Sequence, residues 1–229
     1  MIFLELQAPF GVFRPFTCGT YRPTAAFITS SAAYGLLLNI AGIEMRHSDG
    51  GSPVTKIASG LPRMRLSLAA LEMPDPVRQS LFQQLHTYPV GGTGKEHAAR
   101  AMGRKYHIVP VRREFLSDVR AYIGVNAVPE LEESILAGLS GKRPRRYGLP
   151  FLGDNNFLLD RLEPVEKPQP AYWLEKIGDG REGMRQNVMR LTITIDRADL
   201  SKSRSALFAP SREKKAAPPS ESWIEIGYP

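Results

Sequence analysis

Apolar and polar residues alternate over positions 2–7, which is the period of a β-strand, and Pro9 marks the expected end of that strand. A loop rich in proline, glycine, aromatic residues and arginine follows at 10–16. A helix is then predicted over 23–40, introduced by its first two residues, proline and threonine, and stopped by Gly42. The chain therefore opens in the order strand, basic and aromatic loop, helix.

A second alternation, over 61–71, predicts a strand whose apolar residues oppose a basic face carrying Arg63 and Arg65. Asp75 is a suitable cap for a helix that begins at Pro76 and has apolar residues along one side. The sequence thus predicts a strand followed by a second helix.

Two further strands are predicted at 108–111 and 119–125. The stretch 88–107 would then leave the body of the protein and return, as a long excursion or a hairpin. A helix over 129–139 is indicated by proline at its first position, early glutamates and apolar residues at helical spacing, and Gly141 ends it.

The last third of the chain shows strand patterns at 191–195 and 223–226, and residues 201–220 have the composition of a solvated loop. No internal repeat and no clear linker divides the chain. The alternation of elements predicts an α+β fold with a ferredoxin-like, RRM-like sheet and helices on one face. The RNP1 signature is absent, so a standard RRM that stacks bases on its sheet is not expected.

Composition adds a class of partner to this picture. The 229 residues are 42% hydrophobic and carry a formal net charge of +7, with a pI near 9.6. Such a chain is globular, and its charge favours nucleic acid or an acidic membrane surface as partner. Cys18 is the one cysteine, which fits a reducing compartment, and no leader or membrane-length apolar run is present. We expect a soluble cytoplasmic protein without membrane attachment.

The glycine-rich stretch 88–107 allows two interpretations. Residues 92–95 look like the end of a P-loop, but Pro89 stands where the first glycine of that motif belongs. Glu96 replaces the hydroxyl residue that would hold magnesium. The spacing therefore favours a basic arm for a nucleic acid over a nucleotide site.

Catalytic and metal chemistry finds little support in the sequence. The four histidines form no familiar ligand spacing, and no paired-carboxylate site is present. Asp154 with its two following asparagines is typical of a turn rather than a cation site. Lys105, Tyr106 and His107 have the residue types for metal-independent RNA cleavage, but neighbours on a strand point to opposite faces. We expect no cofactor and no metal.

Three loops combine cations for phosphates with flat side chains for unstacked bases, which favours single-stranded RNA. They are the opening loop, the basic arm over 95–113 and the stretch 145–147. The candidate RNA-binding residues are Arg14, Tyr21, Arg22, Lys95, Arg100, Arg104, Lys105, Arg145, Arg146 and Tyr147.

Several of these stretches resemble the Cas five family of CRISPR-associated proteins, within the RAMP superfamily. The matching stretches are LQAPFGVFRPF at 6–16, YRPT at 21–24, YGLL at 34–37 and RYGLPFLGDNNF at 146–157. They are most similar to the myxobacterial, DevS-like branch of type I systems, with type I-B as the expected subtype. The resembling stretches lie toward both ends of a region that spans roughly residues 1–162.

The resemblance implies one RAMP domain over 1–229, a modified RRM-like fold with a long basic β-hairpin, the thumb, inserted at about 86–108. The part from about 163 to 229 would be loop-rich. The implied role is a noncatalytic subunit of Cascade that grips the 5′ handle of crRNA. The implied partners are the Cas seven family backbone, the Cas eight family large subunit and, through the complex, target DNA in antiviral defence or other RNA-guided targeting.

Two alternatives stay open at this point. One branch of the family cleaves precursor crRNA, and Lys105, Tyr106 and His107 keep such an endoribonuclease in view. A generic basic RNA-binding module is the third possibility, and it would bind without regard to the handle sequence.

Overall fold

The computed structural model describes residues 1–15, 20–47, 56–86, 95–96, 99, 108–144, 148–178 and 185–228. Its helices are α1 (Ser30–Ile40) and α2 (Pro129–Leu139), with short 3-10 turns η2 (Leu200–Lys202) and η3 (Ser220–Ser222). Its strands are β1 (Ile2–Gly11), β2 (Tyr21–Arg22), β3 (Arg46–His47), β4 (Lys56–Ile57), β5 (Met64–Ala70), β6 (Arg78–His86), β7 (Ile108–Asn126), β8 (Arg161–Val165), β9 (Tyr172–Lys176), β10 (Met189–Thr194), β11 (Arg204–Pro210) and β12 (Ile224–Ile226).

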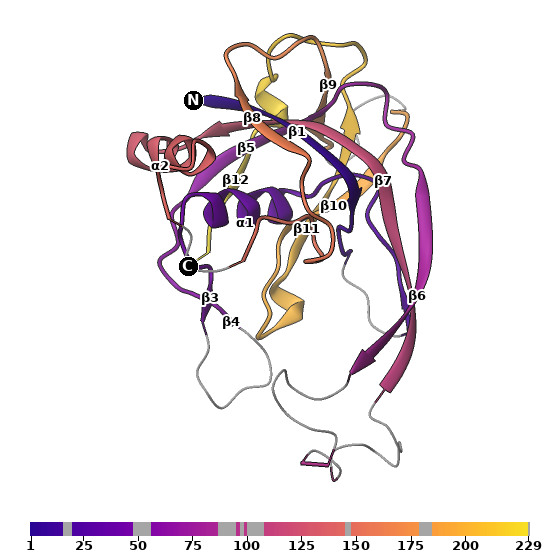
Figure 1. The fold of residues 1–229 in the computed structure, drawn as a ribbon. Coiled ribbons are helices and arrows are strands. Elements are labelled where there is room, and N and C mark those ends of the chain that lie inside the picture. Colours follow the sequence, from indigo (N-terminus) through magenta and orange to yellow (C-terminus); the bar gives the residue numbers. More distant parts are fainter. Residues whose placement is uncertain are drawn as a thin grey trace.

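Four antiparallel strands in the order β8-β1-β7-β5 form the centre of the main sheet. Along the chain these strands and the helices follow the order β1-α1-β5-β7-α2-β8. On its side away from β7, β5 pairs with β12 and β9. Strands β11 and β10 then extend the sheet beyond β9. The fold is α+β, with a mostly antiparallel sheet and two main helices (Figure 1).

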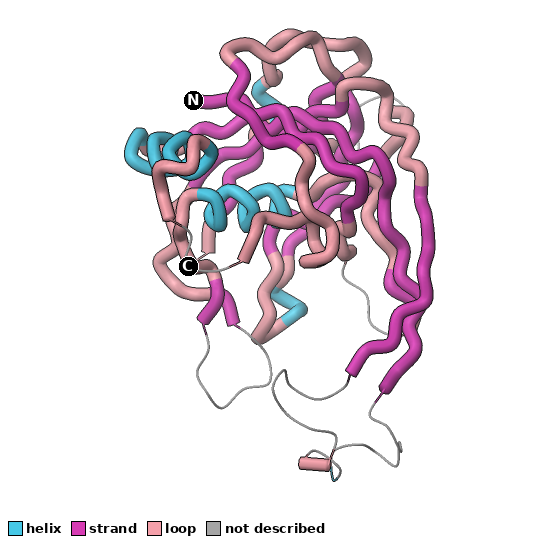
Figure 2. Tube along the Cα trace, viewed as in Figure 1, coloured by secondary structure: helices cyan, strands magenta, loops and turns pink. Residues whose placement is uncertain are grey.

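The long strand β7 joins the body of the sheet to an outer ribbon. Its second half lies between β1 and β5, whereas its first half pairs with β6 on one side and with β2 on the other. Figure 2 shows β6 and the start of β7 running together away from the helices. The pairing of β6 with β7 ends at His86 opposite Ile108, so residues 87–107 connect two paired strands.

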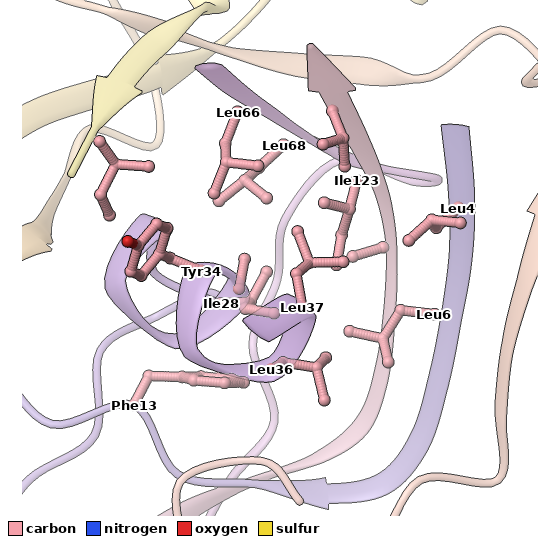
Figure 3. Close-up of a cluster of buried hydrophobic side chains, with 14 of the residues drawn as sticks. Leu4, Leu6, Phe13, Ile28, Tyr34, Leu36, Leu37, Leu66, Leu68 and Ile123 are labelled. Atoms are coloured by element: carbon pink, nitrogen blue, oxygen red, sulfur yellow. The ribbon is translucent and has the colours of Figure 1, made fainter. Parts of the chain in front are cut away.

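The core lies between the central sheet and the helices. One buried cluster contains Leu4, Leu6 and Ile123 from the sheet together with Leu37 of α1 and Ile135 of α2. Figure 3 labels all of these except Ile135. Alternation places these sheet residues on one face. On the other face Trp173 lies fully buried with Tyr122, and its indole Nε1 donates to the carbonyl of Lys215 over 2.9 Å.

Many predicted elements are confirmed. The opening strand, the strands in 61–71, 191–195 and 223–226, and helix 129–139 with its stop at Gly141 all form. The turn at Asp154 is confirmed as well, since its carboxylate accepts from the amide of Asn156.

The predicted helix from Pro76 is wrong, because residues 78–86 form β6. Leu81 and Leu85 are four residues apart, and that spacing places them on one side of a helix and equally on one face of a strand. Pairing with β7 along all nine residues decides between the two.

Three boundaries also differ from prediction. Helix α1 begins at Ser30, because the segment before it is held extended: Thr24 accepts from the amide of Phe13, and Ala25 donates to the Phe13 carbonyl. Strand β1 continues past Pro9, where β8 no longer pairs with it and a missing amide donor costs nothing. The predicted strands 108–111 and 119–125 are parts of the single strand β7.

Two surface assignments are corrected as well. The predicted solvated loop 201–220 contains β11, whose Phe208 is buried, because β9 and β10 lie on either side of it. The face of β5 expected to be basic is partly covered: Ser67 is buried and lies 2.7 Å from the hydroxyl of Ser222. The division of the chain into domains stays a prediction.

The two helices approach closely at Gly138 of α2. A β-carbon there would lie 2.8 Å from the Ile40 carbonyl carbon and still closer to its oxygen. We expect Gly138→Ala to destabilise the protein by about 2 kcal/mol, because backbone atoms of α1 must shift. Urea unfolding measures this change.

Gly35 of α1 is the matched control, since its β-carbon would meet only the Met45 sulfur at 3.6 Å. Gly35→Ala should be neutral or stabilising by up to about 0.8 kcal/mol through helix propensity. Equal destabilisation by both alanines would contradict the close approach at Gly138.

Candidate nucleic-acid interface

The outer ribbon has two faces, because directly paired residues of neighbouring strands share a face. Tyr21 of β2 pairs with Arg112 of β7, and Arg22 pairs with Arg113. Tyr21 and Arg112 therefore lie on one face, and Arg22 and Arg113 on the opposite face. Residues from the opening loop and from the middle of the chain thus meet at β7.

Three arginines, Arg14, Arg22 and Arg113, lie close enough at this part of β7 for their charges to interact, and one carboxylate, that of Asp154, pairs with Arg113. Arg113 is buried, with 5% of its side chain exposed, and its guanidinium forms an ion pair with Asp154. Its Nε is also buried and has no hydrogen-bond partner. Within the part of the chain that the structure describes, no carboxylate pairs with Arg14 or Arg22. The cluster therefore carries excess positive charge.

The pKa values of Arg113 and Arg14 reflect burial together with the same excess of positive charge. Burial, followed by the positive charges of Arg14 and Arg22, lowers the pKa of Arg113. The Arg14 side chain is exposed, yet the surrounding protein partly desolvates its guanidinium. This desolvation, followed by the positive charge of Arg22, lowers the pKa of Arg14 too. Like charges held together destabilise the charged forms, so an anion bound here would relieve the repulsion.

The stretch 148–158 holds this cluster in place. The amide of Val12 donates to the carbonyl of Leu152 over 3.0 Å, and Leu152 is fully buried. Gly153 follows with a φ of 76°, a left-handed conformation that suits glycine, and brings Asp154 to Arg113. The stretch 148–158 thereby links the opening loop to β7.

A cluster of three aromatic rings joins β1, β7 and the stretch 148–158. The rings of Phe10, Phe115 and Phe157 lie 5.3 to 5.7 Å apart between centroids. Offset and edge contacts of this kind stabilise beyond simple burial. The aromatic residues predicted to serve bases in the opening loop are thus partly structural.

On the opposite face, Tyr21 and Arg112 are exposed. The Tyr21 hydroxyl donates to Glu114 over 2.5 Å, and the Arg112 guanidinium lies 6.0 Å from the Tyr21 ring centroid. The hydrogen bond to Glu114 is the main cause that raises the pKa of Tyr21. Glu114 also accepts from the amide of Thr24 over 3.3 Å, so it fixes the loop after β2.

Of the predicted RNA-binding residues, Arg14 and Arg22 lie near Arg113 at β7, and Tyr21 lies at the same strand on the opposite face of the ribbon. Lys95 is exposed. The others lie outside the described residues: Arg100, Arg104, Lys105, Arg145, Arg146 and Tyr147. Tyr106 and His107 of the suggested cleavage trio also lie outside them. The RNA-binding role of all these residues stays a prediction.

The sequence analysis missed the roles of three residues in this site: Arg113, Glu114 and Asp154. Arg112 and Arg113 were counted only as charges of a basic arm. The signal was present in the alternation over 111–115, where Val111 and Phe115 flank Arg113 on the inward face. An arginine at an inward strand position indicates a buried charge that needs a partner.

The described residues form neither a metal-ligand cluster nor a membrane-spanning helix. No three of their histidine, cysteine, aspartate or glutamate side chains lie together as metal ligands would. None of the helices formed by the described segments has the length and apolar character needed to cross a bilayer.

Comparison with known proteins places the chain in a family. The family described as "CRISPR-associated protein (Cas_Cas5)" matches residues 1–158. The comparison with curated sequences finds no match. A chain of a solved structure titled "CRISPR RNA-guided surveillance complex" is similar over 96% of this chain and 95% of its own, with a TM-score of 0.54 and 17% identity.

A second solved structure, titled "Crystal structure of Cas protein", shows 15% identity over 95% of this chain and 99% of its own, with a TM-score of 0.47. At 17% identity the first of these structures bears on the fold alone. The family match covers 158 of 229 residues and includes the cluster around Arg113. The chain therefore belongs to the Cas five family of CRISPR-associated proteins.

Proposed function

We propose that this protein is a noncatalytic crRNA-binding subunit of a type I Cascade complex that holds the repeat-derived 5′ handle of crRNA. The observation that carries the proposal is the cluster of Arg14, Arg22 and Arg113 with one carboxylate, inside the segment matched by the family. In this role it caps the Cas seven family backbone next to the Cas eight family large subunit, in the cytoplasm. The DevS-like branch and subtype I-B belong to the same proposal.

The strand order supports a ferredoxin-like interpretation of the fold. The order β1-α1-β5-β7-α2-β8 along the chain, with β8-β1-β7-β5 in the sheet, is compatible with the βαββαβ arrangement of that fold. In this view β6 and the first half of β7 are the base of the thumb proposed for residues 86–108.

The chemistry of the arginine cluster suits a phosphate. Guanidinium groups bind phosphate oxygens through two parallel hydrogen bonds, and they remain charged when partly desolvated. Arg113 is already held by Asp154, so Arg14 and Arg22 are the groups left to approach the RNA backbone. Asp154 acts here as a positioning residue.

The first experiment purifies the protein from its native host and maps the 5′ ends of the RNA that accompanies it. Ends at one position of a CRISPR repeat are expected. Heterogeneous RNA, or none, would reject handle binding. Uncut repeat RNA after incubation with the protein and a chelator would agree with a noncatalytic role, whereas a cut that His107→Ala abolishes would establish the nuclease instead.

The second experiment measures binding of the recovered RNA as a function of salt. Arg14→Ala and Arg22→Ala should each weaken binding by about tenfold, as expected for a charged hydrogen bond. Each should also lower the salt slope by about 0.7. Arg212, exposed in the turn after β11, is the matched control because Arg212→Ala removes the same charge elsewhere. Equal losses for all three variants would indicate general electrostatics and a generic RNA-binding module.

A further inference from the structure

Three adjacent strands place three flat side chains in one row across the outer ribbon. Arg112 of β7 is paired with Tyr21 of β2 on one side and with Phe82 of β6 on the other. Paired residues share a face, so Tyr21, Arg112 and Phe82 lie side by side on the face away from Arg113. Strands are about 4.8 Å apart, which makes the row roughly 10 Å wide.

We propose that this row is a stacking platform for an unstacked nucleobase of the bound RNA, with Phe82 as its principal ring. The inference rests on the proposed function and adds a binding mode and a residue to it. The base would lie on the Phe82 ring, and the Arg112 guanidinium would continue the flat surface toward Tyr21. Neighbouring phosphates would contact Arg112 and Arg78, which lies on the same face of β6.

The exposure of Phe82 is the first reason for this assignment. It is 81% exposed, more than any other large hydrophobic residue in the part of the chain that the structure describes. Its neighbours on the same face of β6 are Arg78, Ser80 and Gln84, all exposed. Two aromatic rings, Phe82 and Tyr21, set among cations and polar groups suit a base and its phosphates better than they suit the broad apolar surface of a protein partner.

The second reason is that the rest of the row is already oriented. The hydrogen bond from Tyr21 to Glu114 holds the tyrosine ring, and the Arg112 Nε lies 3.4 Å from the Ser80 hydroxyl. Glu114 is engaged by Tyr21 and by the amide of Thr24. Less conformational freedom is therefore lost when a base binds.

The test uses the full chain with single-stranded RNA recovered from it, resynthesised with 2-aminopurine at single positions. Phe82→Ala and Phe82→Leu should weaken binding by about tenfold, with the salt slope unchanged, because stacking involves no counterion release. Phe82→Tyr should bind like wild type. At one position the fluorescence of 2-aminopurine should be quenched by wild type and by Phe82→Tyr alone.

Val128→Ala is the control for loss of exposed apolar surface, since Val128 is 56% exposed before α2. It should leave both readouts unchanged. Urea unfolding of each Phe82 variant should match wild type, because so exposed a ring adds little to stability.

Each other outcome overturns the inference in a recognisable way. Wild-type affinity for Phe82→Ala, with the dependence on Arg14 intact, would reject the platform and leave the proposed function standing. Wild-type affinity for Phe82→Leu would show an apolar contact rather than stacking. Weaker assembly with protein subunits at unchanged RNA affinity would make Phe82 a protein-docking residue. Absence of RNA binding by wild type would reject the proposed function itself.

Discussion

Asp154→Asn is expected to destabilise the protein by about 3 kcal/mol, because it leaves the Arg113 charge buried without its counterion. Arg113 is 5% exposed and Asp154 10%, and the charges of Arg14 and Arg22 add to the cost of the unpaired group. Asparagine keeps the oxygen that accepts from the Asn156 amide, so the turn itself is preserved. The free energy of unfolding in urea measures the effect.

The exposed ion pair between Arg120 and Asp118 is the matched control. Its side chains are 55% and 69% exposed, and Asp118→Asn makes the same chemical change. The expected loss there is under about 1 kcal/mol. The double variant Asp154→Asn with Arg113→Met should recover most of the stability, since it removes the orphaned charge. Similar losses at positions 118 and 154 would contradict a decisive buried pair.

Gly153→Ala is expected to destabilise the protein by about 3 kcal/mol or more, through backbone strain and a direct clash. The residue has a φ of 76°, and a β-carbon would lie 2.8 Å from the Val12 carbonyl carbon and closer still to its oxygen. The substitution must displace either the opening loop or Asp154. We therefore expect weaker RNA binding as well, because Arg14 follows Val12 by two residues.

Gly141→Ala separates the two causes. Gly141 has a φ of 72°, but no atom lies within 4 Å of the position its β-carbon would take. The expected loss is about 1 kcal/mol from conformation alone. If Gly153→Ala costs no more than Gly141→Ala, the close approach of the two loops does not constrain the site.

The candidate site was predictable in its residue types more than in its arrangement. Arg14, Tyr21 and Arg22 are recognisable because cations and an aromatic ring stand close together in the sequence. Arg113 was not, since its role depends on Asp154, which is 41 residues away. The helix predicted from Pro76 failed for a related reason: the partner of β6 lies beyond residue 107, and long-range pairing outweighs local periodicity.

The sequence by itself determined the elements whose signals are local. Helix 129–139, the stop at Gly141 and the turn at Asp154 depend on interactions within a few residues, and the family match follows from motifs read along the chain. Only the tertiary structure decided that β7 is one strand with two different pairs of neighbours. That pairing places Arg22 with Arg113 on one face and Tyr21 with Arg112 and Phe82 on the other. Strand register is set by contacts between residues distant in sequence, so no local pattern contains it.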